Sequence, residues 1–145
     1  QSAPIGTPNR WLNPVGVSDL DGDGRAEIAA IITPHIGGIL KVYRREGHAL
    51  VEIAAMRGLS NHVYGSAELE LSTPALVRGQ PRLVAPDQRR SSLRFVALTP
   101  SGLVETGRCT LDAPVAGPVR QRHDGRITAV IDGGRSVTLP DDCGG

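Results

Sequence analysis

One stretch decides the fold of this chain: PVGVS-DLDGDGRAE-IAAIIT, residues 14–33. Residues 14–18 predict a short strand that leads into an acidic loop at 19–27. After the loop, residues 28–33 form a continuous apolar run that ends before Pro34. The short length of this run, its β-branched residues and the proline after it favour a buried strand over a helix. The stretch therefore predicts two strands joined by the acidic loop.

The loop has the composition of a cation site. Carboxylates stand at its first, third, fifth and ninth positions, and the backbone carbonyl at the seventh position adds another oxygen. Calcium binds about six to eight oxygens, and without a cation the carboxylates would repel one another. The sequence therefore predicts a Ca²⁺ site whose ligands are Asp19, Asp21, Asp23, Glu27 and the carbonyl of Arg25. An acidic turn without metal is the alternative.

The loop does not fit an EF-hand. An EF-hand needs a bidentate Glu at the twelfth loop position and a helix after the loop. The twelfth position here is Ala30, and the apolar run is followed by Pro34 and a Gly37-Gly38 turn. These residues favour a second strand after the loop.

Similar sets of strands recur along the chain. Apolar runs at 39–44 and 49–55 complete a first set of four strands joined by tight turns. A second set of four and a third set of three follow, at 74–77, 82–85, 93–98 and 103–106, and then at 113–119, 127–131 and 136–139. Units spaced about forty to sixty residues apart predict an all-β, propeller-type array of four-stranded antiparallel sheets.

Composition and charge exclude several classes of function. The net charge is +1, so the chain has no overall field to recruit nucleic acid. No run approaches the roughly 18 apolar residues of a membrane helix, so no membrane span is expected.

The chain starts at Gln1 without a charged and apolar leader, and it is therefore expected to be a mature, trimmed or excised piece.

The two cysteines, Cys109 and Cys143, have no metal-type spacing. They predict one disulfide, which would stabilise the fold by about 4 kcal/mol on the chain-entropy model. Two buried free thiols are the alternative. A disulfide and a calcium-type loop both favour a periplasmic or secreted protein.

The sequence carries no motif of catalysis: a nucleophile elbow, a phosphate loop and a dinucleotide fingerprint are all missing. The four histidines are scattered without metal-ligand spacing. His62 lies in the irregular connection between the first two sets of strands, where functional loops concentrate. It is the residue expected to face a ligand, and no catalytic residue is predicted.

Residues 16–29, GVSDLDGDGRAEIA, resemble the FG-GAP or VCBS repeat of bacterial β-propellers and integrin-type head domains. The specific match runs from Val15 to Arg45. The resemblance implies that the loop joins the first two strands of a blade and holds Ca²⁺, although the family more often has Asp where this chain has Glu27. The corresponding loops at 78–81 and 123–126 lack this set of carboxylates, so one calcium site is expected.

The resemblance also implies a partial ring. Propellers of this family close with about seven blades, and this chain encodes about two and a half. The expected parts are an incoming segment (1–13), a blade with the calcium loop (14–57), a connection (58–72), a second blade with a degenerate loop (73–112) and a third, incomplete blade with a C-terminal tail (113–145). The other blades would lie upstream in the same protein or on a partner chain, or this chain would self-associate.

These expectations lead to a non-enzymatic, exported calcium-binding scaffold, or to a module that binds protein or glycan. One alternative is part of a propeller-fold hydrolase or lyase acting on glycans, with its catalytic residues in other blades. A second alternative is a subunit of a larger assembly whose other blades belong to a partner chain.

Overall fold

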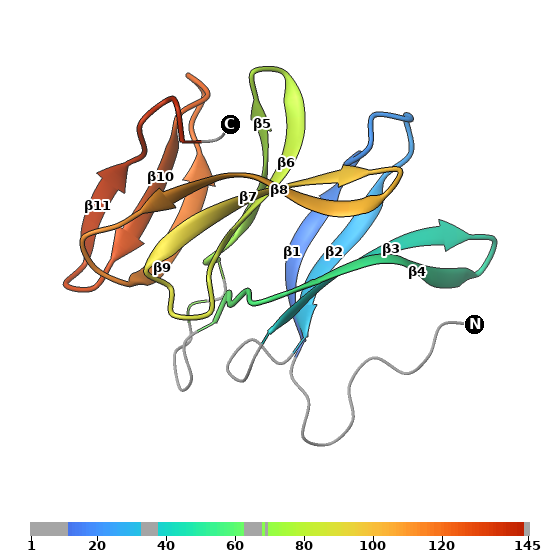
Figure 1. Ribbon diagram of the computed structural model, residues 1–145, viewed down its shortest axis with the longest axis horizontal. Coiled ribbons are helices and arrows are strands. Elements are labelled where there is room, and N and C mark those ends of the chain that lie inside the picture. The colour runs from blue at the N-terminus through green and yellow to red at the C-terminus, as the bar shows by residue number, and fades with distance from the viewer. Residues whose placement is uncertain (1–11, 33–37, 63–67, 69, 144–145) are drawn as a thin grey trace.

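The computed structural model describes residues 12–32, 38–62, 68 and 70–143, which form an all-β arrangement of eleven strands in three antiparallel sheets (Figure 1). The first sheet contains β1 (Leu12–Ser18), β2 (Glu27–Ile32), β3 (Ile39–Glu46) and β4 (Ala49–Arg57). The second contains β5 (Thr73–Val77), β6 (Gln80–Pro86), β7 (Ser92–Thr99) and β8 (Gly102–Thr110). The third contains β9 (Val115–Gln121), β10 (Ile127–Ile131) and β11 (Arg135–Thr138). The all-β class expected from the sequence is confirmed.

The strands lie where the apolar runs predict them, with their ends shifted by a few residues. β1 starts at Leu12 and not at Pro14, because its first two residues still pair with the last two residues of β2. β8 continues to Thr110, beyond the expected end at Thr106, because it stays paired with β7. Most of the expected incoming segment and part of the expected connection lie outside the described residues.

The second sheet lies between two apolar cores. One core packs side chains of the first sheet against the second, and the other packs the second sheet against the third. β6 serves both cores, because Leu83 and Ala85 belong to the first and Val84, between them, belongs to the second. This alternation follows from the two-residue period of a strand. The three sheets are therefore held together face to face.

Equivalent strands of successive sheets lie next to one another. β1 contacts β5, β5 contacts β9, and β4 contacts β8. The β1–β2, β5–β6 and β9–β10 connections all lie at one end of the molecule, at the top of Figure 1. Among the described residues, the three sheets form an open series and do not close on themselves.

A buried polar link joins the first sheet to the beginning of the second. Asn13 Nδ2 donates a hydrogen bond to the Asn61 carbonyl at 3.0 Å. Asn61 Nδ2 donates to the Asn13 carbonyl at 3.2 Å and to Ser72 Oγ at 3.1 Å. All three residues are buried. Because these hydrogen bonds are directional, they fix the position of Asn61 between the two sheets.

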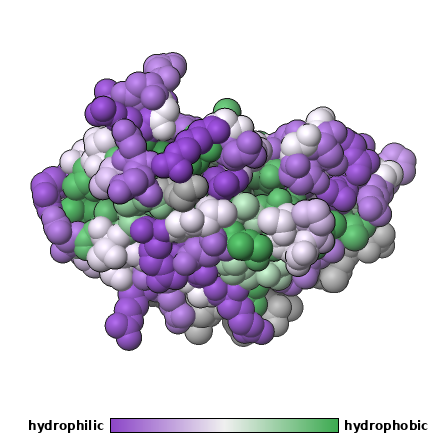
Figure 2. All heavy atoms as spheres, turned by 45° about the horizontal axis from the view of Figure 1, so that its top comes forward, coloured by the Kyte–Doolittle hydropathy of each residue, from purple (hydrophilic) through white to green (hydrophobic). Residues whose placement is uncertain are grey.

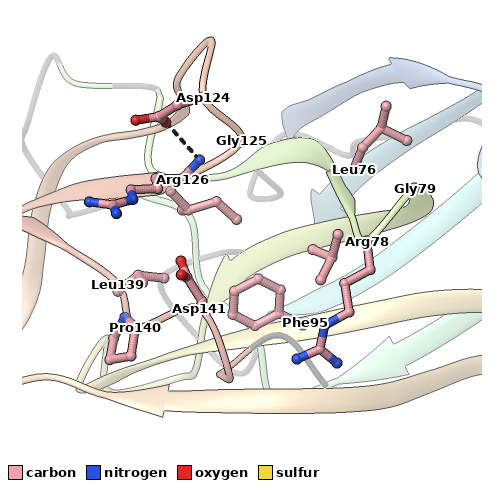
Figure 3. A pocket seen from close by; sticks show the side chains of 12 residues that line it. Leu76, Arg78, Gly79, Phe95, Asp124, Gly125, Arg126, Leu139, Pro140 and Asp141 are labelled. Carbon is pink, nitrogen blue, oxygen red and sulfur yellow. Dashed lines mark hydrogen bonds between the residues drawn. The ribbon is translucent and has the colours of Figure 1, made fainter.

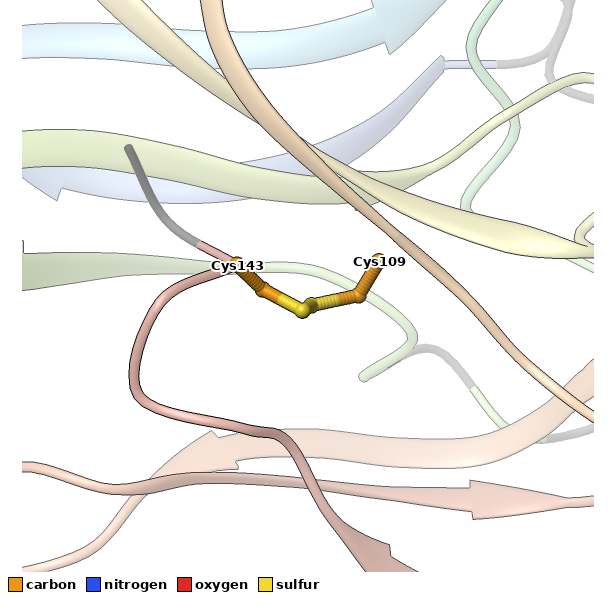
Figure 4. The surroundings of a disulfide bond; sticks show 2 residues. All are labelled: Cys109 and Cys143. Atoms are coloured by element: carbon orange, nitrogen blue, oxygen red, sulfur yellow. A yellow bond between two sulfur atoms is a disulfide. The ribbon is translucent and has the colours of Figure 1, made fainter.

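The two cysteines are paired. Cys109 is on β8 and Cys143 follows β11, and their Cα atoms lie 5.3 Å apart (Figure 4). Cys109 is buried in the second core. The pair spans 34 residues of sequence and ties the segment after β11 to the second sheet. The expected cysteine pair is confirmed at disulfide distance, which is consistent with an oxidising compartment.

Candidate metal centre

The acidic loop connects β1 to β2, and the four predicted carboxylates meet in it. One oxygen from each of Asp19, Asp21, Asp23 and Glu27 lies within 4.8 Å of the others. Ser18 and Glu27 pair across the two strands, so the strands bring the two ends of the loop together. The loop therefore gathers into one acidic cluster the side-chain ligands that the sequence predicts.

Asp19 organises the first turn of the loop. Its Oδ1 accepts a hydrogen bond from the Gly22 N–H at 2.9 Å, and its Oδ2 accepts one from the Gly24 N–H at 2.8 Å. The two glycines have φ angles of +80° and +86°, which residues other than glycine rarely adopt. The glycines allow the chain to curl so that both N–H groups point at one carboxylate.

Asp21 and Asp23 continue the same pattern further along the loop. Asp21 Oδ1 accepts from the Asp23 N–H at 3.1 Å, and Asp23 Oδ1 accepts from the Arg25 N–H at 2.8 Å. The hydrogen bond from the Arg25 N–H lowers the pKa of the Asp23 carboxyl. Each of these two aspartates keeps its Oδ2 clear of the loop N–H groups. The loop backbone therefore orders the carboxylates and leaves oxygens for another partner.

Glu27 is the buried member of the cluster, with no exposed surface. Its Oε1 accepts from the Leu20 N–H at 2.8 Å, while its Oε2 is buried without a hydrogen-bond partner. Burial raises the pKa of the Glu27 carboxyl, and the negative charges of Asp21 and Asp23 add to this effect. An unpartnered buried carboxylate oxygen is costly, and a bound cation would satisfy it.

Arg44 on β3 faces the same cluster from the neighbouring strand, where it pairs with Glu27 in the sheet register. Its Nη2 donates to Asp21 Oδ2 at 2.8 Å. Arg25 contributes a weaker contact, with its Nε 3.7 Å from Asp23 Oδ2. Four carboxylates against two guanidinium groups leave two negative charges in excess when all are ionised. That excess matches the charge of one divalent cation.

The donor set fits a hard cation. All four side chains offer carboxylate oxygens, which Ca²⁺ and Mg²⁺ prefer over nitrogen and sulfur ligands. Within the residues that the structure describes, no other group of His, Cys, Asp or Glu gathers in this way. The acidic cluster can therefore hold a metal ion, and ligation by the Arg25 carbonyl stays a prediction.

The equivalent connections of the other two sheets have no such cluster. The β5–β6 connection is the two-residue turn Arg78-Gly79, which lies within the loop expected at 78–81. The β9–β10 connection contains one carboxylate, Asp124, whose Oδ1 accepts from the Arg126 N–H at 3.0 Å.

The structure places His62 in the interior. Its side chain is 2% exposed, and it follows Asn61 in the buried link between the first two sheets. This burial argues against the ligand-facing role expected from the sequence. The irregular connection is therefore buried at His62, which the sequence did not predict.

A pocket of about 640 Å³ lies between the second and third sheets (Figure 3). Arg78 and Arg126 line it from two facing connections, Asp141 lines it from the C-terminal segment, and Phe95 and Leu139 add apolar surface. Among the described residues, neither of these arginines forms an ion pair. The exposed lining of the pocket is more polar than apolar, so the pocket differs from the predominantly apolar pockets that bind organic ligands.

Gln121 at the end of β9 forms hydrogen bonds with two residues that line this pocket, Leu76 and Gly125. Its Nε2 donates to the Leu76 carbonyl at 2.6 Å and to the Gly125 carbonyl at 3.0 Å. Its Oε1 accepts from the Leu76 N–H at 2.9 Å. One side chain therefore connects the edge of β5 to the β9–β10 connection, and nothing in the sequence pattern distinguished it.

Comparison with protein-family models, with curated proteins and with solved structures gives no match to this chain. Within the described ranges, no helix has the length and apolar character needed to span a membrane.

Proposed function

We propose that this chain is a non-enzymatic, calcium-stabilised β-propeller segment, exported to the periplasm or outside the cell, that serves as a scaffold or as a module binding protein or glycan. The observation that carries the metal assignment is Glu27 Oε2, which is buried, has no hydrogen-bond partner and is part of a cluster of four carboxylates. A Ca²⁺ ion at this position would satisfy that oxygen and neutralise the excess negative charge.

The role of the metal in this proposal is structural. The loop holds the two strands at its ends in register, and its carboxylates repel one another without a cation. Calcium sites of extracellular modules commonly have dissociation constants of about 0.1–1 mM. Such an affinity suits a compartment with abundant calcium, and the cysteine pair at disulfide distance supports the same compartment.

The repeated architecture supports the propeller assignment. All three sheets are meanders, and equivalent strands of successive sheets contact one another. A separate apolar core fills each space between neighbouring sheets. Blades of a propeller repeat radially in this manner, and the remaining blades of the ring would come from elsewhere.

The third sheet favours a partner that supplies further strands. It has three described strands, and β11 pairs with β10 alone among them. An unpaired strand edge is a template for another strand. On the face in Figure 2, hydrophobic residues are interspersed with hydrophilic ones. The mass of the protein in solution tests this, since a monomer at every concentration contradicts self-association.

Thermal unfolding tests the metal site. With about 10 mM calcium and the dissociation constant given above, ligand binding adds about 1.4–2.7 kcal/mol to the free energy of unfolding. The melting temperature should therefore rise by roughly 3–10 °C relative to excess chelator. The Asp21→Ala variant should lose this rise. Asp112→Ala is the matched control, because that side chain is 89% exposed and outside the cluster. Equal melting of the wild type with and without calcium contradicts the proposal.

A further inference from the structure

Arg44 lies where the oxygens left over by the loop converge. These oxygens are Oδ2 of Asp21, Oδ2 of Asp23 and Oε2 of Glu27, and none of them accepts a loop N–H. The Nη2 atom of Arg44 lies 2.8, 4.0 and 3.9 Å from them, in that order. The guanidinium therefore faces the oxygens that a metal ion would use.

We propose that Arg44 is an internal counter-cation that competes with Ca²⁺ for the acidic cluster and so weakens the affinity of the site. The inference rests on the proposed calcium site and names the residue that tunes it. To bind Asp21 Oδ2, the ion must displace the guanidinium from that oxygen. Two cations within about 4 Å of one another in a partly buried site repel strongly.

The same contact keeps the loop ordered without metal. Arg44 neutralises part of the charge of the cluster through its hydrogen bond to Asp21 and its approach to Glu27. It is held by β3, and its side chain is 24% exposed, so solvent screens the contact only in part. The metal-free protein therefore keeps a cation in the cluster, and calcium replaces it.

The structure has room for the displaced guanidinium. A cavity of about 480 Å³ borders Asp21 and Arg44 and is lined on its other side by Ile53, Leu98 and Thr99. Arg44 already lines this cavity, so its flexible side chain can turn toward the β7–β8 connection while β3 stays in place. Calcium entry and movement of Arg44 are therefore sterically compatible.

Arg45 provides a matched control. It carries the same charge at the next position of β3, is exposed, and donates from Nε to the Gly47 carbonyl at 3.1 Å. Arg44→Gln and Arg45→Gln change the net charge of the protein equally. Only the first removes a charge from the cluster.

Calcium titration calorimetry of the wild type, R44Q, R44K and R45Q tests the proposal. Removal of the competing charge should tighten calcium binding by R44Q by about tenfold or more. R44K keeps the charge at this position. The calcium dissociation constants of R44K and R45Q should therefore stay within about threefold of that of the wild type. Melting in chelator should show the opposite order, with R44Q less stable than R45Q.

The outcomes separate the two proposals. If the wild type binds calcium and R44Q binds it equally or more weakly, Arg44 does not compete and the inference is overturned while the calcium site remains. If no variant binds calcium, both proposals fail. Should R44Q unfold without metal, back-titration of its calcium-loaded form with a chelator of known affinity gives the same comparison.

Discussion

The β1–β2 and β5–β6 connections occupy equivalent places in two sheets of the same topology, yet they are held by different means. The first is a loop of acidic residues ordered by its own carboxylates, and Asp19 alone accepts two N–H groups. The second is a two-residue turn fixed by a neighbour, since Gln121 of β9 hydrogen-bonds to both backbone groups of Leu76. The four-stranded meander therefore forms with or without an acidic loop, and the loop adds a cluster of four carboxylates that could hold a metal ion.

The largest effect should come from breaking the acidic loop at Asp19. Asp19→Ala removes two hydrogen bonds to a charged group together with one carboxylate of the acidic cluster. We expect a loss of about 2–3 kcal/mol in the free energy of unfolding in calcium, as measured by denaturant titration. Asp124→Ala is the matched variant in the β9–β10 connection. It removes a single turn hydrogen bond, and a calcium-dependent loss in that variant would contradict a local role for the cluster.

The β5–β6 turn should be destabilised when the side chain of Gln121 is removed. Gln121→Ala removes three hydrogen bonds of partly exposed groups, and we expect destabilisation by about 1–2 kcal/mol. The calcium-dependent rise in melting temperature should be unchanged, because Gln121 lies outside the acidic cluster. Gln80→Ala, at an exposed position on β6, is the control. Loss of the calcium response in Gln121→Ala would show that the two connections are coupled.

A smaller effect should come from the buried carboxylate of Glu27, and it should appear as a pH dependence of the free energy of unfolding in chelator. The folded-state pKa of Glu27 is raised above its unfolded value of 4.5, so the folded protein binds the proton more tightly. Stability therefore falls as pH rises from about 4.5 through the raised folded-state pKa. The free energy of unfolding of the wild type minus that of Glu27→Gln should fall with rising pH in chelator. In calcium this difference should no longer fall. A flat difference in chelator would mean that burial of Glu27 carries no charge penalty.

The smallest effect should be an increase in stability, caused by replacing Arg78 in the β5–β6 turn. Arg78 has a φ of +52° in the β5–β6 turn, a conformation that favours Asn, Asp or Gly in two-residue hairpins. Arg78→Asn should raise the free energy of unfolding by about 0.5–1 kcal/mol. Arg90 also has a positive φ, of 59°, but its Nε donates to the Val115 carbonyl at 3.1 Å. Arg90→Asn should therefore gain less, and an equal gain would weaken the backbone explanation.

The sequence was sufficient for the strands and for the side chains of the cluster. Apolar runs between turn residues are local signals, and four carboxylates within one loop are necessarily close in space. Arg44 could not be found in this way. Its approach to Glu27 depends on the register between β2 and β3, which a sequence pattern specifies only through the details of the connection.

Packing between sheets explains the other differences. His62 lies in the irregular connection between the first two sheets, yet it is only 2% exposed. The β5–β6 turn is limited to Arg78-Gly79, where both residues have positive φ, although an arginine does not indicate that conformation. Gln121 is a common polar residue in a strand, and its importance arises from the adjacent sheet. Long-range contacts of this kind leave no local signal.

The pairing of Cys109 with Cys143 has a mechanical consequence. A pulling force applied at Cys143 passes through the covalent bond to β8 of the second sheet. The residues between the two cysteines, 110–142, which include β9, β10 and β11, are bypassed and carry no tension. β11 therefore cannot be peeled from its sheet by a load at that end of the chain, and reduction of the disulfide would make the third sheet the first part to yield.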